Sequence, residues 1–224
     1  MKLPRGALRI ALVLLVVPTA IIAVYRFVDP PLTPLMVIRA AEGETLQHRS
    51  VPLAAISPHL RAAVIASEDN LFCRHHGFDT RALRGQFETW LAGERPRGAS
   101  TITMQTAKNI LLWPGRDPAR KLIEAALTPQ IEALWSKQRI LEVYLNVIEM
   151  GPGIYGAEAA AQHYFNKPAS ALNRQEATLI AAVLPNPRAF SPTRPSPFVT
   201  RQASRIVRRI GQLGPLLDCI GGTR

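Results

Sequence analysis

The sequence predicts one mainly α-helical domain behind a single N-terminal transmembrane helix. Three observations lead to this expectation: an uncharged apolar run near the N-terminus, helical periodicity that recurs from residue 57 onward, and N-cap residues before most periodic segments. With 224 residues, 47% of them hydrophobic, the chain can bury one sizeable core but not two large domains. We therefore expect a single domain.

The composition indicates an anionic partner without identifying it. The formal net charge is +11, which suits nucleic acid, a phospholipid surface or a phosphorylated substrate equally well. The two cysteines, Cys73 and Cys219, lie far apart and show no zinc-like spacing. Neither a metal site nor a disulfide framework follows from them, although one bridge between the two stays open.

Residues 10–28 are the expected transmembrane anchor, preceded by a cytoplasmic segment at residues 1–9. The run from Ile10 to Tyr25 is uncharged, and basic residues stand before it at positions 2, 5 and 9. A span needs roughly 20 residues, so flanking apolar residues must extend the run. The alternative is a cleavable signal peptide, but no small-residue cleavage site ends the run before Arg26. Either way the rest of the chain lies outside the cytoplasm, which disfavours nucleic acid as the partner.

The segment after the anchor is expected to be extended. Residues 29–49 are assigned to a stalk, because DPPLTP and scattered polar residues show no helical period, and the same character continues to residue 56. The first helix of the domain then begins with Ser57 as N-cap and Pro58 in the first turn. Its apolar face leads to Glu68, which therefore lies at the C-terminal end of this helix.

Later helices are predicted from caps and apolar stripes. Asp79 can cap a helix that ends near Gly93, and Asp117 followed by proline starts another. Ser136 is a further cap, and Asn173 with Glu176 forms a capping box. Five prolines between residues 185 and 197 force an extended segment, and apolar residues then recur at helical spacing over 199–213.

The first stretch whose side chains are suited to catalysis is EDNLFCRHHGFD, residues 68–79. A carboxyl group at the end of an apolar helix is partly desolvated, which raises its pKa and suits it to general acid or base catalysis. The alternative is structural: Glu68 and Asp69 pair with Arg74 or hydrogen-bond a turn. This stretch alone does not decide between them.

Two further stretches carry groups that suit an anion. RGASTITMQTAKN, residues 97–109, is a glycine-led turn with hydroxyls at a helix start, where an ordinary cap is the alternative. GRDPARKLIE, residues 115–124, aligns two cations and a carboxylate on one helical face, where a solvated salt-bridge face is the alternative. Three of the five lysines, Lys108, Lys121 and Lys137, lie in the motif-bearing segments, which favours phosphate binding over surface decoration.

Together these stretches resemble one family, the peptidoglycan glycosyltransferases, and especially the monofunctional biosynthetic transglycosylases of Gram-negative bacteria. The resemblance covers residues 50–215 and leaves 216–224 as a tail. It rests on five ordered motifs: ED-x-x-F-x-x-H-x-G-x-D at 68–79, G-x-S-T-I-T-x-Q at 98–105, R-K-x-x-E at 120–124, K-x-x-I-L-E-x-Y-L-N at 137–146 and AAVLPNP at 181–187. Two departures are Met104, where the family often has a second glutamine, and Pro129, which should kink a helix.

The resemblance implies a reaction and its site residues. Glu68 matches the catalytic base that deprotonates the 4-hydroxyl of the acceptor sugar, and Glu124 matches a second essential acid. The implied reaction polymerises lipid II through β-1,4 bonds with inversion and releases undecaprenyl pyrophosphate. The expected pyrophosphate contacts are Lys108, Arg116, Arg120 and Lys121, and the substrate-binding set also includes Asp69, Ser100 and Gln105. Cations there would stabilise the departing pyrophosphate.

The resemblance also implies a setting. The family fold is lysozyme-like, with a larger lobe and a smaller lobe near the membrane, and the protein would be a single-pass protein of the inner membrane with a periplasmic catalytic domain. Its partners would be lipid II, the nascent glycan strand and the bilayer; assembly proteins stay open, and nucleic acid is not expected. A divalent cation, Mg or Mn, could assist, although the sequence shows no dedicated metal cage. An apolar stripe at Leu83, Phe87, Trp90 and residues 111–113 could face the membrane, though such stripes more often belong to a core.

Three rival functions are weighed against this one. A lytic transglycosylase or lysozyme would cleave glycan with an acidic residue, but would not need the basic cluster and lacks these motifs. An inactive glycan-binding scaffold is disfavoured because both Glu68 and Glu124 are present. A bifunctional penicillin-binding protein is excluded for this chain, since neither Ser-x-x-Lys nor Lys-Thr-Gly occurs.

Overall fold

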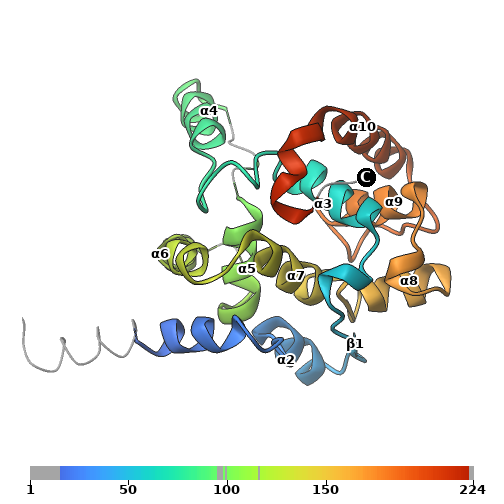
Figure 1. The fold of residues 1–224 in the computed structure, drawn as a ribbon, viewed down its shortest axis with the longest axis horizontal. Coiled ribbons are helices and arrows are strands. Elements are labelled where there is room, and N and C mark those ends of the chain that lie inside the picture. Colours follow the sequence, from blue (N-terminus) through green and yellow to red (C-terminus); the bar gives the residue numbers. More distant parts are fainter. Residues whose placement is uncertain (1–15, 95–97, 99, 116, 222–224) are drawn as a thin grey trace, which may run out of the picture.

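The fold is mainly helical, as the sequence predicted (Figure 1). The computed structural model describes residues 16–94, 98, 100–115 and 117–221. Its α-helices include α2 (Pro34–Ala41), α3 (Pro58–Glu68), α4 (Thr80–Leu91), α5 (Ile102–Leu111), α6 (Pro118–Leu134), α7 (Lys137–Val147), α8 (Ala157–Phe165), α9 (Arg174–Val183) and α10 (Pro197–Leu213). Short 3-10 helices are η1 (Leu53–Ala55), η2 (Ala169–Ala171) and η3 (Gly214–Ile220).

The helices begin where their cap residues predicted. Ser57 accepts a hydrogen bond from the His59 backbone at the start of α3, and the side chains of Asp79 and Asp117 accept from the first turns of α4 and α6. Ser136 caps α7, and the predicted capping box starts α9. Each cap satisfies a backbone N–H that the helix itself leaves without a partner.

The core lies between two groups of packed helices. Helix α3 packs against α9 and α10, while α5 packs against α6 and α7. Helix α7 contributes much of the interior, because residues 140, 141 and 143–147 along it are buried. Burial of so much apolar surface is the main source of stability for this arrangement. It also fixes the end of α3 beside the start of α5, where several motif residues lie.

A small three-stranded sheet closes one side of the domain. It consists of β1 (Gln47–His48), β2 (Glu149–Gly151) and β3 (Ile154–Tyr155), in the order β1-β3-β2. Strands β1 and β3 are parallel, whereas β2 and β3 are antiparallel and joined by a tight turn. Gly153 in this turn has a φ of +69°, and a Cβ there would lie 2.3 Å from the carbonyl oxygen of Thr45. Only glycine fits both requirements.

The expectation of an extended segment at residues 29–56 is wrong in part. Thr33 caps α2, and Pro34 occupies its first turn, so a proline taken as a sign of extended chain begins a helix instead. Met36 of α2 is fully buried, and α2 packs against α5. Residues 47–48 enter the sheet as β1. These residues are therefore packed onto the domain.

The described part of the expected anchor also contacts the domain. Residues 16–25 are helical, Ile22 is fully buried, and the indole Nε1 of Trp135 donates to the Ile22 carbonyl oxygen at 2.7 Å. The Arg139 guanidinium donates to the carbonyl oxygens of Tyr25 and Val28 and pairs with Asp29. Residues 1–15, including the first part of the expected span, lie outside the described residues. Within the described ones, no helix combines the length and apolar character needed to cross a membrane.

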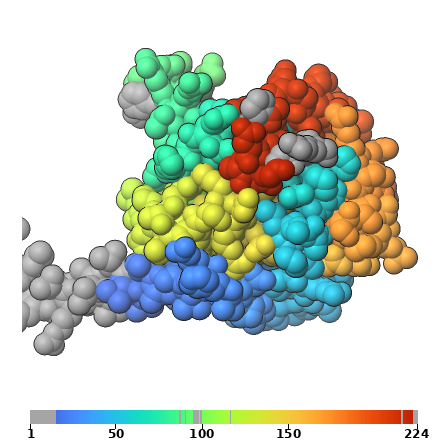
Figure 2. All heavy atoms as spheres, in the orientation of Figure 1, coloured from blue at the N-terminus to red at the C-terminus, as the bar shows by residue number. Residues whose placement is uncertain are grey.

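Two expectations about individual helices have mixed outcomes. Pro129 lies inside helix α6, which continues to Leu134, and the kink expected there stays a prediction. Helix α4 stands away from the main body (Figures 1 and 2), and its Leu83 and Leu91 are exposed, as is Trp113 after α5. Leu112, in contrast, is buried in the core. The predicted apolar stripe is thus split between the surface and the interior.

Candidate active site

A polar pocket of about 220 Å³ lies where the end of α3 meets the residues before α5. Glu68 and Asp69 line it from the α3 end, Ser100 and Thr101 from the start of α5, and Arg209 from α10. The other lining residues are Ser67, Asn70, Asp79, Ala82 and Gly98. Two of the five motifs, distant in sequence from each other, therefore meet at one concavity.

Glu68 is held in the pocket by two hydrogen-bond donors. The side-chain amide Nε2 of Gln105 donates to its Oε2 at 2.9 Å, and the Ser67 hydroxyl donates to its Oε1 at 3.2 Å. Burial raises the pKa of the Glu68 carboxyl, while the bonds from Gln105 and Ser67 and the charge of Lys108 lower it in part. The net effect is a raised pKa. A fixed carboxylate with a raised pKa is well suited to accept a proton near neutral pH.

Tyr144 lies behind this contact and was not predicted as a site residue. Its hydroxyl donates to the Oε1 of Gln105 at 3.0 Å, and its side chain is fully enclosed, with 1% of its surface exposed. Burial, with the nearby charges of Glu68 and Asp69, raises its pKa well above the ordinary value. The residue belongs to the fourth motif, but the sequence offered no sign that this tyrosine faces Gln105.

Asp69 uses its carboxylate for hydrogen bonds within the protein. Its carboxylate lies 2.9 and 3.0 Å from Nε2 of His75 and accepts from the backbone N–H of Ile102, the first residue of α5. The Gly77 N–H donates to Nδ1 of His75, so Nε2 carries the ring proton that faces Asp69. The carboxylate thereby ties the end of α3 to the positive end of α5. The structure brings Asp69 to the pocket wall, but most of its surface is covered.

The predicted cations gather around Glu124. This carboxylate is buried and accepts from Nη1 of Arg120 at 2.7 Å and from Nζ of Lys121. Lys121 also donates to the hydroxyl of Ser100, at 3.0 Å. Since Ser100 lines the pocket, this cluster adjoins the pocket that holds Glu68. Arg120 and Glu124 are buried, while Lys121 is partly exposed beside them, so this face of α6 is not a fully solvated salt-bridge face.

The charge of Lys108 interacts both with Glu68 and with the ionic groups around Glu124. Burial lowers its pKa, the charge of Glu124 raises it, and the charges of Arg120 and Lys121 lower it. The pKa of Glu68 is in turn lowered by the charge of Lys108. Lys108 on α5 thus links the pKa of Glu68 to the charges of the cluster around Glu124.

Of the remaining cations in the motifs, Arg116 lies outside the described residues. Lys137, the third motif lysine, pairs with Glu132 at 2.7 Å and lies 4.6 Å from the ring centroid of Phe72. These contacts join Lys137 of α7 to α6 and to the loop after α3, whereas Lys121 pairs with Glu124.

Arg209 is a pocket residue that sequence reasoning missed. It lines the pocket beside Glu68 and donates to the carbonyl oxygen of Ala66, at 3.3 Å, near the end of α3. The amphipathic pattern of residues 199–213 predicted its helix, but several arginines share that helix and nothing in the pattern singled out this one. Its place depends on how α10 packs against α3.

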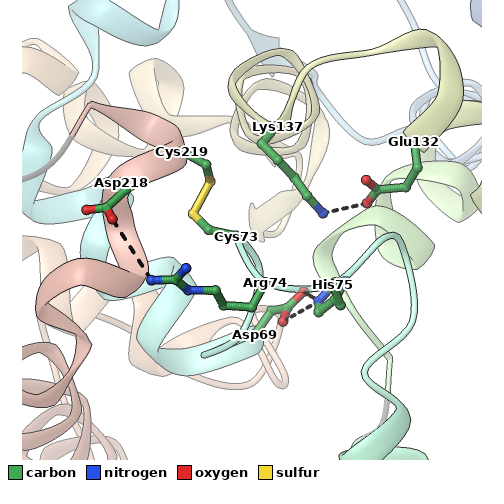
Figure 3. Close-up of a disulfide and its surroundings, with 8 residues drawn as sticks. All are labelled: Asp69, Cys73, Arg74, His75, Glu132, Lys137, Asp218 and Cys219. Carbon is green, nitrogen blue, oxygen red and sulfur yellow. Dashed lines mark hydrogen bonds and ion pairs between the residues drawn. A yellow bond between two sulfur atoms is a disulfide. The ribbon is translucent and has the colours of Figure 1, made fainter.

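A disulfide fixes the loop that follows Glu68 and Asp69. Cys73 and Cys219 are bonded, with Cα atoms 5.5 Å apart. Figure 3 shows the bridge linking the loop after α3 to η3, with the ion pair of Arg74 and Asp218 beside it at 3.9 Å. Asp69 and His75 lie on the same loop (Figure 3). The C-terminal end is therefore attached covalently to the border of the pocket.

The described residues include no group of three or more His, Cys, Asp or Glu side chains arranged to hold a metal ion. What the pocket presents is one carboxylate able to accept a proton and, next to it, cations anchored by a buried acid. Such a pair suits an enzyme that activates a hydroxyl and transfers a group away from an anionic leaving group. The fold and the pocket thus define a group-transferring enzyme.

Comparison with known proteins identifies the family. The family model described as Transglycosylase matches residues 36–211. The chain is 53% identical over 212 residues to a biosynthetic peptidoglycan transglycosylase of Rhodospirillum centenum, covering 93% of this chain and 92% of that one. A protein of the same name from Caulobacter vibrioides is 47% identical over 215 residues, covering 95% and 94%. The chain belongs to the transglycosylase family and is a glycosyltransferase, which confirms the resemblance seen in the motifs.

Proposed function

We propose that this chain is a peptidoglycan glycosyltransferase that polymerises lipid II into β-1,4-linked glycan strands, with inversion at the anomeric carbon and release of undecaprenyl pyrophosphate. One observation carries the proposal: a desolvated carboxylate, Glu68, faces a pocket that adjoins cations gathered around the buried Glu124. The reaction needs both parts, since a hydroxyl must lose a proton while a pyrophosphate departs. The names of the relatives support the substrate class.

In this proposal each residue has a separate role. Glu68 takes the proton from the 4-hydroxyl of the acceptor sugar, and that oxygen attacks the anomeric carbon of the donor as its bond to pyrophosphate breaks. Lys108, Lys121, Arg120 and, from outside the described residues, Arg116 stabilise the charge that develops on the leaving oxygens. Glu124 keeps Arg120 and Lys121 in place, as its two ion pairs indicate. Asp69, Ser100 and Gln105 shape the substrate-binding wall.

A glycan-cleaving enzyme is the rival reaction. Hydrolysis also uses carboxylates, but its leaving group is a sugar hydroxyl and needs no cluster of cations. Burying Arg120 and Glu124 beside the partly exposed Lys121 carries a desolvation cost, and a pyrophosphate ligand gives a reason for that cost. An inactive scaffold would not require a carboxylate held as firmly as Glu68.

The same proposal includes a membrane setting. Residues 10–28 would form a single inner-membrane span, residues 29–49 its connection to the domain, residues 50–215 a lysozyme-like two-lobed catalytic domain in the periplasm, and residues 216–224 its tail. The disulfide supports an oxidising compartment, and exposed Leu83, Leu91 and Trp113 support contact with lipid. The chain's partners would be lipid II and the glycan strand; partner proteins of cell-wall assembly are neither assigned nor ruled out.

The membrane setting can be tested by fractionation and protease access. We expect the full chain to float with inner-membrane vesicles and to be digested in spheroplasts, where the periplasmic face is open, but not in intact cells. An N-terminal tag should stay protected in both. Recovery of the chain in the cytosolic fraction, or a mature N-terminus beyond residue 23, would contradict a retained anchor.

The proposed reaction can be tested directly with purified lipid II. We expect the detergent-solubilised full chain to convert lipid II into polymer with release of undecaprenyl pyrophosphate, and a muramidase to digest that polymer. Incubation with preformed glycan strands is the control that addresses the rival. Fragmentation of those strands without any polymer from lipid II would show a cleaving enzyme and refute the proposal.

A further inference from the structure

We propose that Tyr144 is a positioning residue that orients the side-chain amide of Gln105, so that the NH₂ group of the amide faces Glu68. The inference rests on the proposed role of Glu68 as the catalytic base. Tyr144 touches neither the carboxylate nor the pocket in this arrangement; it acts through one intervening side chain. Three residues on three different helices, α7, α5 and the end of α3, thus form one hydrogen-bonded line.

The two ends of the amide are distinguished by their partners. An amide has a donor end and an acceptor end, so its orientation follows from what each end meets. The Tyr144 hydroxyl donates to Oε1 at 3.0 Å, and Nε2 donates to Oε2 of Glu68 at 2.9 Å. Burial and the nearby carboxylates keep Tyr144 protonated, so its hydroxyl stays available as a donor. A rotated amide would turn an oxygen toward the carboxylate oxygen of Glu68.

The orientation matters because it sets which form of Glu68 is favoured. A donor facing the carboxylate stabilises the charged, proton-accepting form, whereas an oxygen facing it stabilises the protonated form. Ser67 and Asp69 beside it and Lys108 on α5 also act on Glu68, and the charged Asp79 and Arg209 line the same pocket. Of these, Lys108 favours the charged form and Asp69 opposes it. Tyr144 donates to the amide oxygen at the end opposite Glu68, and so holds the amide with its NH₂ group against the carboxylate.

The test is the pH dependence of polymerisation by the full chain in detergent. Tyr144→Phe removes the donor to the amide oxygen, so the NH₂ group is held less firmly against Glu68 and the acid limb of the pH–rate profile should move to higher pH, by about one pH unit. The rate on the alkaline plateau should stay close to that of the unchanged protein, because Glu68 is then ionised in both. Tyr164→Phe is the matched control: its hydroxyl donates to the Met150 carbonyl oxygen at 3.2 Å, and the acid limb should not move.

A second variant separates positioning from simple packing. Gln105→Met removes the donor itself, so its acid limb should shift in the same direction, and adding Tyr144→Phe to it should cause no further shift. A rate lowered equally at every pH in Tyr144→Phe, with an unmoved acid limb, would overturn the inference. If circular dichroism shows that Tyr144→Phe does not fold, an unmoved acid limb in Gln105→Met overturns it instead. Failure of the proposed function is a different result, since the unchanged protein would then form no polymer or Glu68→Gln would stay active.

Discussion

Glu68→Gln is expected to lower the rate of lipid II polymerisation by about two to four orders of magnitude while the protein stays folded. The amide has nearly the same shape and can still meet Gln105 and Ser67, but it cannot take a proton from the acceptor hydroxyl. The change should therefore appear in the turnover rate and not in the binding of lipid-linked substrate. Polymer formation from purified lipid II measures the first, and equilibrium binding measures the second.

The stability of this variant provides an internal check. Burial raises the pKa of Glu68 in the folded state, so the folded protein binds more protons than the unfolded chain between the two pKa values, and stability falls as pH rises through the folded pKa. Removing the charge should leave the melting temperature of Glu68→Gln at or above that of the unchanged protein at neutral pH. Glu42→Gln, at the end of α2 in an exposed pair with Arg39, is the matched control and should retain its activity. Near-normal polymerisation by a folded Glu68→Gln would refute the assignment of the base.

Lys121→Ala is expected to lower the turnover rate by about 100-fold and to raise the apparent lipid II requirement much less. Charge concentrates on the pyrophosphate oxygens as the glycosidic bond breaks, so contacts with them strengthen in the transition state. Lys121 is the preferred cation to remove because 42% of its side chain is exposed, and Glu124 keeps Arg120 as its partner after the change. Removing Arg120 instead would leave Glu124 less well paired and could unfold the site.

The control for this experiment is a cation outside the site. Arg201 lies exposed on α10, and Arg201→Ala also lowers the net charge by one, so it should keep both kinetic constants. Steady-state kinetics over a range of lipid II concentrations, with circular dichroism for folding, separates the two effects. A folded Lys121→Ala variant with unchanged turnover would show that the cluster around Glu124 serves stability and not the leaving group.

The parts of the structure that depend on neighbouring residues were predictable from the sequence. Ser57, Asp79 and the capping box at Asn173 started helices as expected, since a cap acts within one turn. Glu68 reached the end of its helix for the same reason. The extended conformation expected for residues 29–56 was wrong in part, because proline is compatible both with extended chain and with a first helical turn. The structure decides for the helix, whose Met36 is buried against the domain.

The parts that depend on distant residues were not predictable. The bond between Tyr144 and Gln105 joins residues 39 positions apart, and Arg209 reaches Ala66 across 143 positions. Neither contact leaves a periodic or spacing signal, because both depend on how whole helices pack. The motifs correctly grouped Lys121, Arg120 and Glu124, but only the structure shows that Arg120 and Glu124 are buried while Lys121 is partly exposed. Lys137 belonged to a motif as well, and it pairs with Glu132.

The bridge between Cys73 and Cys219 also determines an order of assembly. The two cysteines are 146 residues apart, and a ribosome adds residues from the N-terminus onward, so Cys73 has to wait as a thiol while nearly the whole domain is made. During that time α3 and its pocket residues exist without their covalent attachment to η3. A chain released before residue 219 would never acquire it. The covalent link at the border of the pocket is therefore completed among the last events in the biogenesis of this protein. The pocket carboxylates Glu68 and Asp69, in contrast, belong to the first third of the chain.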